Sequence, residues 1–325
     1  MSKKQKRTEP KQVPTKRQLS KWQRQTRMRR IIISVAAVFL IGIAGWVCYG
    51  IYNDKIKPSR EVALTINDAT FNMGYYVKML DARIKMVERQ SGEEMGTDTI
   101  YYYADWFIGK ATNQITHDEL IKQGADDLEI SVTDEEIDEK IEEINWPDEQ
   151  VYRDMIATSL LQEKLLNEYF EPRLNATMNQ THIQVMLVES EGVADSVITK
   201  IEGGGNFTEL AANFSCNHTV EGDLGWLPQE LMPNPLIANV SSSLEPGETG
   251  SIYDESAINQ TEGGYWIIEV LDKGQHGLSE EVREGLAQNE FDEWFEQQRE
   301  NSTINNYLDE NKKSWAIDRV VQGRQ

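Results

Sequence analysis

The residue types that most often carry metal or nucleophilic chemistry are thinly spread along this chain. Its 325 residues include four histidines and two cysteines, and none of these stands at the spacing of a metal-binding motif. The three glycines at 203–205 end a predicted helix and do not follow a strand, so they form no phosphate-binding loop. We therefore expect no metal and no cofactor. The histidines are His117, His182, His218 and His276.

A short block of residues at fixed spacing is more informative. The sequence GDLGW at 222–226 follows NFTELA at 206–211 and precedes LEPGE at 244–248. This arrangement resembles the core of the parvulin-type (rotamase) peptidyl-prolyl cis-trans isomerases. The resemblance is good over 185–273, and it implies a small β-α-β domain with an antiparallel sheet that acts on X-Pro peptide bonds.

Isomerisation of an X-Pro bond breaks no covalent bond, which explains how an enzyme could lack nucleophiles and metals. The barrier of about 18–20 kcal/mol comes from amide resonance. A catalyst needs an apolar slot that takes the proline ring out of water, and polar groups that favour the twisted amide. In parvulins a methionine and a phenylalanine line the slot, and an aspartate or cysteine with two histidines forms the polar network behind it.

The slot positions are kept in apolar form. The resemblance places the methionine on Met232 and the phenylalanine on Leu236, which is smaller but still apolar. The two histidine positions fall on Val185 and Trp266, which we assign to substrate binding with the slot residues. Plain core packing is the alternative for Met232, Leu236 and Trp266.

The polar network is largely rewritten. Its aspartate or cysteine position falls on Asn217, and Cys216 could take this place after a shift of one residue. For Asn217 the alternative is a residue that only supports a turn. A rival alignment sets His182 at the first histidine position and lengthens the following segment by three residues. Two hypotheses stay open, a weak isomerase and a holdase that binds prolyl or apolar segments without catalysis; an envelope-complex scaffold is a third.

The N-terminus predicts a single membrane anchor. The first 30 residues hold 12 lysines and arginines, and residues 31–52 carry no charge. At about 1.5 Å per residue this run covers the roughly 30 Å hydrocarbon core. The positive-inside bias places the N-terminus in the cytoplasm and the bulk of the chain outside. The bulky neighbours of Cys48 argue against a lipoprotein cysteine.

The rest of the chain is acidic. Beyond residue 30 there are 21 basic and 53 acidic residues, a balance that disfavours nucleic acid and favours basic or unfolded polypeptide partners. Only Cys216 lies there among the cysteines, so no intramolecular disulfide is expected. Eight N-x-[ST] sequons also fit a glycosylated eukaryotic protein, but the resemblance favours a bacterial one.

The segment between the anchor and the isomerase-like block is predicted to be mostly helical. A strand at 61–66 is followed by a cap at 67–70 and a helix at 73–90. Three further helices are expected. The first spans 100–123 and ends at Gly124, the second begins at the capping box TDEE at 133–136, and the third spans 148–170. This order, with ISVTDEEI at 130–137 and LLQEKL at 160–165, resembles the chaperone region of extracytoplasmic foldases of the PrsA/SurA kind.

Together these patterns predict an α+β chain with a transmembrane helix and a small antiparallel domain. That domain should hold strands at 183–188 and 265–270, helices at 193–201, 207–214 and 235–240, and a loop at 222–226. A long acidic helix is expected after Ser279. The predicted boundaries are a basic cytoplasmic tail at 1–30, a membrane helix at 31–52, a helical chaperone-like domain at 53–178, a parvulin-like domain at 179–275, and a C-terminal helix at 276–325 that packs on the helical domain.

Overall fold

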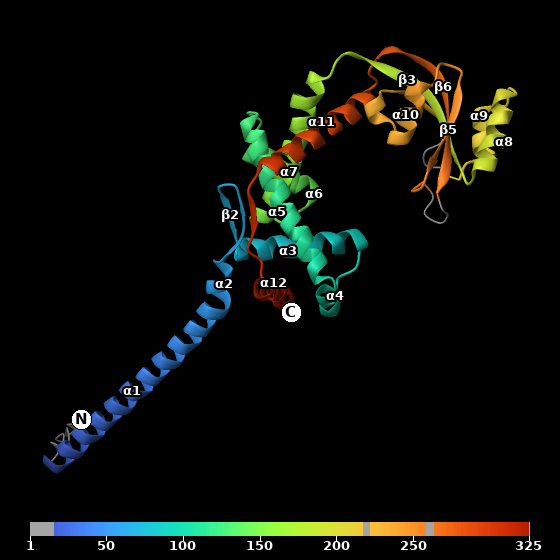
Figure 1. Ribbon diagram of the computed structural model, residues 1–325. Helices are drawn as coiled ribbons and strands as arrows, with labels where there is room; N and C mark the ends of the chain where they lie inside the picture. Colours follow the sequence, from blue (N-terminus) through green and yellow to red (C-terminus); the bar gives the residue numbers. More distant parts are fainter. Residues whose placement is uncertain (1–15, 217–221, 258–262, 325) are drawn as a thin grey trace, which may run out of the picture. The chain divides into compact units, whose positions relative to one another are not determined.

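The computed structural model describes residues 16–216, 222–257 and 263–324 (Figure 1). Its contacts divide the chain into two compact units. The first consists of 1–112 with 305–325, and the second of 113–304. The unit boundaries are defined by contacts between residues, whereas the domain boundaries expected from the sequence are defined by motifs. The domain boundaries therefore stay a prediction.

The first unit begins with a long apolar helix. Helix α1 (Lys16–Ile51) continues through a π-helical turn η1 (Tyr52–Ile56) into α2 (Lys57–Ser59). The segment 26–59 is long and apolar enough to cross a membrane, and its apolar side chains are exposed, Trp46 to 77%. The uncharged run predicted at 31–52 lies within this helical segment.

A three-stranded sheet and a helical layer form the rest of this unit. The strands are ordered β2-β1-β7, and β1 pairs antiparallel with β2. The chain reverses at Asn67, which adopts a left-handed φ of 50°, and the cap of α3 is Asn72. The cap predicted at 67–70 was therefore wrong, because that segment forms the hairpin turn and the start of β2. The elements are β1 (Val62–Ile66), β2 (Ala69–Asn72), α3 (Met73–Ser91), α4 (Thr97–Tyr102), β7 (Ile304–Asn306) and α12 (Glu310–Gly323).

The second unit contains helices packed around two hydrophobic clusters. Thr133 and Glu136 form the predicted capping box at the start of α6. Helix α11 contributes Ala287 and Phe291 to a cluster with Leu165 and Phe170. The prediction that Gly124 ends its helix was wrong, because Gly124 lies within α5 (Ala104–Asp127). Helix α5 begins in the first unit and continues into the second. The other helices are α6 (Asp134–Ile144), α7 (Gln150–Lys164), η2 (Leu165–Phe170), η3 (Glu171–Arg173) and α11 (Glu280–Asn301).

The same unit contains a four-stranded sheet with the order β4-β3-β6-β5, and every neighbouring pair is antiparallel. Helices α8 and α9 cover one face and α10 covers the other (Figure 1). The segment 222–226 was predicted as a loop, but it forms most of β4. The elements are β3 (Thr177–Val188), α8 (Glu191–Glu202), α9 (Phe207–Phe214), β4 (Gly222–Leu227), η4 (Gln229–Leu231), α10 (Pro235–Ser243), β5 (Thr249–Asp254) and β6 (Gly264–Gly277).

Candidate functional site

One face of the four-stranded sheet is a continuous apolar surface. Successive side chains of a strand point to opposite faces, so alternate residues of β3 and β6 meet on this side. The α10 residue Ile237 packs on them and is fully buried. The buried strand residues of this cluster are Ile183, Val185, Leu187, Trp266, Ile268 and Val270.

Met232 lies over this face and remains half-buried. The segment that carries it is held from α11. The Asn289 side-chain amide donates a hydrogen bond to the Glu230 carbonyl at 3.2 Å. The Leu231 side chain packs over Gly285, where an added Cβ would lie 3.1 Å from its Cδ1. Helix α11 therefore fixes the backbone from which Met232 reaches the apolar face.

Asp254 fixes the other end of the same segment. Its Oδ2 accepts hydrogen bonds from the Asn234 amide at 2.7 Å and from the Trp266 indole at 3.0 Å. Its Oδ1 accepts from the Ser256 backbone at 2.9 Å and from the Ser256 hydroxyl at 2.8 Å. Burial opposes ionisation of this carboxyl, but the four hydrogen bonds outweigh it, so the pKa of Asp254 lies below its ordinary value.

Asn234 connects Asp254 to the start of α10. Its side chain caps the helix by accepting a hydrogen bond from the Leu236 backbone at 2.7 Å. Leu236 is half-buried in the first turn, but it is not among the side chains packed on the apolar face. Of the four residues assigned to substrate binding, the structure brings Met232, Val185 and Trp266 into one cluster and leaves Leu236 beside it.

The two positions to which the resemblance assigns histidines are apolar and closed to solvent. Val185 is fully buried and Trp266 is 5% exposed. The indole N–H of Trp266 has its acceptor in Asp254. If that assignment holds, a packed side chain and an indole held by a carboxylate take the place of two histidines of the network.

Cys216 joins the end of α9 to β3. Its backbone N–H donates to the Leu187 carbonyl at 2.8 Å, and its Sγ lies 3.1 Å from the same oxygen. The Ser215 hydroxyl accepts from the Leu187 N–H at 3.3 Å. Asn217, our first candidate for the polar position, lies outside the described residues.

His182 takes part in a separate polar and aromatic cluster. Its Nε2 lies 2.6 Å from Asp223 Oδ1 of β4, and its ring is 5.4 Å from that of Trp226. Trp226 in turn lies 3.7 Å, centre to centre, from the His276 ring. The histidine restored by the rival alignment thus pairs with the GDLGW segment and is not part of the apolar cluster. No group of three or more potential metal ligands occurs within 16–216, 222–257 and 263–324.

Sequence reasoning missed Asp254. A signal was present, because the aspartate is followed two residues later by Ser256, the pattern of a turn in which a carboxylate caps its own backbone. That pattern predicts the bonds to Ser256 but not those to Asn234 and Trp266. The latter two depend on the pairing of β5 with β6, where Asp254 faces Gly264.

Comparison with known families finds two adjoining matches. The model of the SurA-like N-terminal domain matches residues 19–184. The model of the PPIC-type PPIase domain matches residues 175–274, which contain the whole sheet up to Gly274 and the candidate site.

Curated relatives match across much of the chain. Foldase protein PrsA of Geobacillus kaustophilus is 27% identical over 236 residues, which cover 64% of this chain and 77% of the relative. Foldase protein PrsA of Caldanaerobacter subterraneus is 24% identical over 318 residues, covering 89% and 92%. Chaperone SurA of Nitrosococcus oceani is 28% identical over 123 residues, covering 34% and 27%.

Among solved structures, the peptidylprolyl isomerase PrsA of Bacillus anthracis aligns with a TM-score of 0.36 at 17% identity. The alignment covers 65% of this chain and 95% of that one. PrsA of Bacillus cereus aligns with a TM-score of 0.33 at 14% identity, covering 81% and 99%.

Proposed function

Since this chain belongs to the family of proteins with a SurA-like N-terminal domain, we propose that it is an extracytoplasmic foldase. In this proposal it binds unfolded segments of exported proteins and isomerises their X-Pro bonds slowly. Uncatalysed isomerisation takes on the order of 10–100 s, long enough to delay the folding of an exported protein.

The observation that carries the proposal is the placement of Met232. It is a half-buried methionine over a buried apolar sheet face, on a segment restrained from two sides. A proline ring seated against Met232 would leave water without disturbing the core beneath it. A methionine side chain adapts its shape to different bound residues, which suits a protein with many clients.

The polar half of the mechanism rests on fewer groups than in parvulins. We assign to Asn217 the task of stabilising the twisted amide, with Cys216 as the alternative. The Cys216 thiol contacts the Leu187 carbonyl, so it is engaged with the backbone of β3. Weak catalysis follows from this assignment, because hydrogen bonding to one amide replaces a network of an acid and two histidines.

A non-enzymatic holdase is the second candidate, and the burial of Val185 and Trp266 favours it. Both positions now contribute packing in place of polar groups. If the remaining groups do not stabilise the twisted amide, the slot would bind prolyl segments and release them without turnover.

We also propose that α1 anchors the protein in the cell membrane by a single span, with a cytoplasmic N-terminus. Support comes from the 12 lysines and arginines of the first 30 residues and from the exposed apolar surface of the helix. The acidic remainder would then face the outside, where unfolded exported chains emerge.

A protease-coupled prolyl-peptide assay on the full chain in non-ionic detergent tests the proposal. Acceleration by the wild type should be lost in Met232→Ala and in Leu236→Lys, and should change in Asn217→Ala. The matched control is Met178→Ala, which removes a half-buried methionine of β3 outside the apolar cluster. Met178→Ala should keep the wild-type rate.

Aggregation of a denatured client separates the two candidates. Suppressed aggregation without acceleration of isomerisation would establish the holdase. A wild-type chain that neither accelerates isomerisation nor suppresses aggregation would overturn both. An unchanged rate in Asn217→Ala would remove Asn217 from the mechanism.

A further inference from the structure

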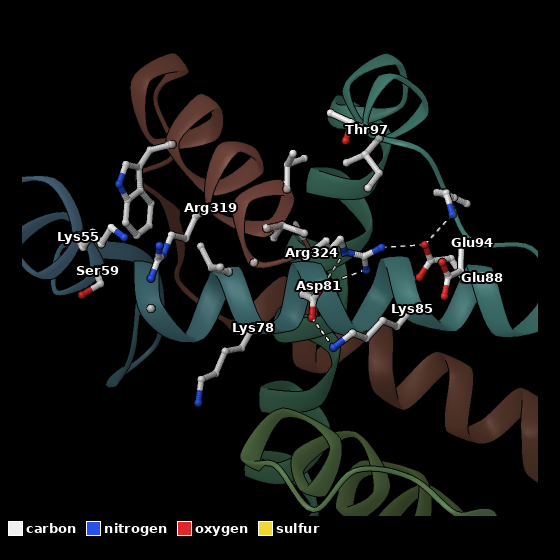
Figure 2. A pocket seen from close by; sticks show the side chains of 18 of the residues that line it. Lys55, Ser59, Lys78, Asp81, Lys85, Glu88, Glu94, Thr97, Arg319 and Arg324 are labelled. Atoms are coloured by element: carbon white, nitrogen blue, oxygen red, sulfur yellow. Dashed lines mark hydrogen bonds and ion pairs between the residues drawn. The ribbon is translucent and has the colours of Figure 1, made fainter.

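A groove of about 900 Å³ lies in the first unit (Figure 2). Its walls come from α3, from α12, from the segment before α4 that holds Glu94, and from α4 itself at Thr97. One end is closed by the turns that follow α1, which contribute Lys55, Ile56 and Ser59. The groove therefore begins where the long apolar helix stops.

Part of the charge in this groove is internally compensated. Arg324 donates to Asp81 at 2.9 Å and to Glu88 at 2.7 Å, and Lys85 lies 2.8 Å from Asp81 (Figure 2). These four side chains form a connected network across α3 and the end of α12. They hold the two elements together and leave little charge for a ligand.

The end nearer to α1 is different. Lys55, Lys78 and Arg319 line the groove, and none has a carboxylate within ion-pair distance among the described residues. Figure 2 shows Arg319 beside Ser59 and Lys55, whereas the Lys78 side chain lies further along α3 and extends from the opposite side of that helix. Beyond residue 30 acidic residues outnumber basic ones by 53 to 21, so three uncompensated cations in one groove form a local exception. Such a site attracts a compact anion.

The position of this end relative to the apolar helix indicates which anion. Lys55 follows Ile51, the last residue of α1, by four residues of helical backbone, a rise of about 6 Å. Ser59 stands about 12 Å beyond Ile51 on the same basis. The headgroup layer extends about 5–8 Å beyond the hydrocarbon core on each side of a bilayer. Lys55 therefore falls at the depth of lipid phosphates when α1 spans the membrane.

A hydrogen bond holds helix α12 at the same depth as the residues that follow α1. The indole N–H of Trp315 donates to the Asp54 carbonyl at 3.0 Å. Tryptophan is enriched at membrane interfaces, where its ring is half apolar and its N–H is hydrated or paired. Arg319 follows Trp315 by one turn, so its guanidinium is presented next to Lys55.

We propose that this groove binds the phosphate of an anionic phospholipid headgroup in the outer leaflet. Lys55 and Arg319 would contact the phosphate, and Lys78 would add attraction from α3. Bound lipid would fix the first unit against the membrane. The inference rests on the anchoring proposed above, and it adds a specific site to what would otherwise be a simple tether.

Native mass spectrometry of the full chain in detergent micelles, titrated with phosphatidylglycerol or with phosphatidylcholine of the same acyl chains, tests the site. The wild type should prefer phosphatidylglycerol. Each basic residue near a membrane surface contributes about 1 kcal/mol, or roughly fivefold, so Lys55→Gln with Arg319→Gln should weaken this binding about 25-fold. The matched control, Lys122→Gln with Arg299→Gln in the other unit, removes the same charge and should shift it less than twofold.

A phosphatidylglycerol with a photoreactive headgroup, used on vesicles that contain the full chain, locates the contact. Cross-links to 55–59 and 315–324 would support the site, whereas cross-links confined to the basic residues 1–30 would overturn it. Equal binding by wild type and double variant would also overturn it, as would full displacement of the lipid by equimolar inorganic phosphate, which indicates a soluble-anion site. Extraction of membranes with alkaline carbonate tests the anchor separately, because loss of the chain from the pellet refutes anchoring whatever the lipid titration shows.

Discussion

Replacing Gly124 by alanine should destabilise the second unit although it improves a helix. Gly124 lies inside α5, where glycine costs about 1 kcal/mol relative to alanine. A Cβ at this position would lie 2.8 Å from Cη2 of Trp294 and closer still to its Cζ2. The indole cannot move aside freely, because it also packs against Phe170 at 5.8 Å and Phe291 at 5.6 Å between ring centres.

The two effects can be weighed against each other. Overpacking of a filled core costs about 1–3 kcal/mol, so the net change for Gly124→Ala is a loss of about 0–2 kcal/mol. Gly109 is a matched control in the same helix, with no atom within 4 Å of the added Cβ. Gly109→Ala should therefore stabilise the chain by up to about 1 kcal/mol. The two substitutions are identical in chemistry and opposite in expected sign.

Thermal unfolding of the full chain in detergent, followed by tryptophan fluorescence, measures both. A loss of 1 kcal/mol in a unit of this size lowers its midpoint by about 2–4 °C. Trp294→Phe in the Gly124→Ala background should recover stability, because the smaller ring leaves room for the methyl group. If Gly124→Ala raised the midpoint as much as Gly109→Ala does, α11 would not pack on α5 as described, and the reasoning would fail.

Two further predictions concern buried carboxyls. Burial raises the pKa of Asp118 above its ordinary value, and its contacts with His117 and Gln114 offset only part of that effect. The ionised carboxylate therefore lowers the free energy of unfolding at neutral pH. Asp118→Asn should raise the thermal midpoint at neutral pH, and this gain should shrink as the pH falls toward the ordinary aspartate pKa. An advantage that persisted unchanged at acidic pH would show that burial of charge is not its cause. Asp254→Ala leaves the Trp266 indole without its acceptor and should lower the free energy of unfolding by about 1–3 kcal/mol. Because the pKa of Asp254 is lowered, the stability that its carboxylate contributes should persist at neutral pH and fade only below the ordinary aspartate pKa. Urea midpoints of the wild type and the variant, measured between pH 3 and pH 7, test this, and a difference that did not narrow at the acidic end would contradict it.

The elements that local sequence predicts well are those with their own start signals. The capping box at Thr133, the N-cap at Asn206 and the N-cap at Ser279 each begin a helix where expected. The overall class, helical regions with antiparallel sheets, is confirmed. In each case a side chain within three residues satisfies free backbone N–H groups, so the signal does not depend on distant residues.

Strand β4 could not be predicted in this way. Its sequence GDLGW contains two glycines, which disfavour strands and suggest a loop. In the structure Gly222 and Gly225 have positive φ values of 82° and 71°, and the pairing with β3 shifts register beside them. The glycines permit an irregular edge strand, and only the partner strand reveals that the segment is paired.

Strand β7 and helix α12 also could not be predicted from local sequence. The sequence predicts the acidic helix after Ser279 as the last element. In the structure β7 follows it and joins β1, and the Tyr307 backbone N–H donates to the Ala63 carbonyl at 2.9 Å. Lys312 reaches the Val62 carbonyl at 2.8 Å. Partners separated by about 250 residues leave no local pattern, although they determine where α12 packs.

In the candidate site, one carboxylate links a buried indole to the segment that carries Met232. An indole in the middle of a sheet is tolerated only when its N–H finds an acceptor, and Asp254 provides one. The same carboxylate holds Asn234, and Asn234 caps the helix that follows Met232. Trp266 is thus coupled through Asp254 and Asn234 to the start of α10, which follows Met232. Under the proposed function, this coupling would keep the apolar slot in place for a prolyl segment, and the rate of isomerisation would depend on Asn217, or on Cys216 as the alternative. Under that proposal, substitutions at Asp254 or Asn234 should act on binding, and substitutions at Asn217 or Cys216 should act on turnover.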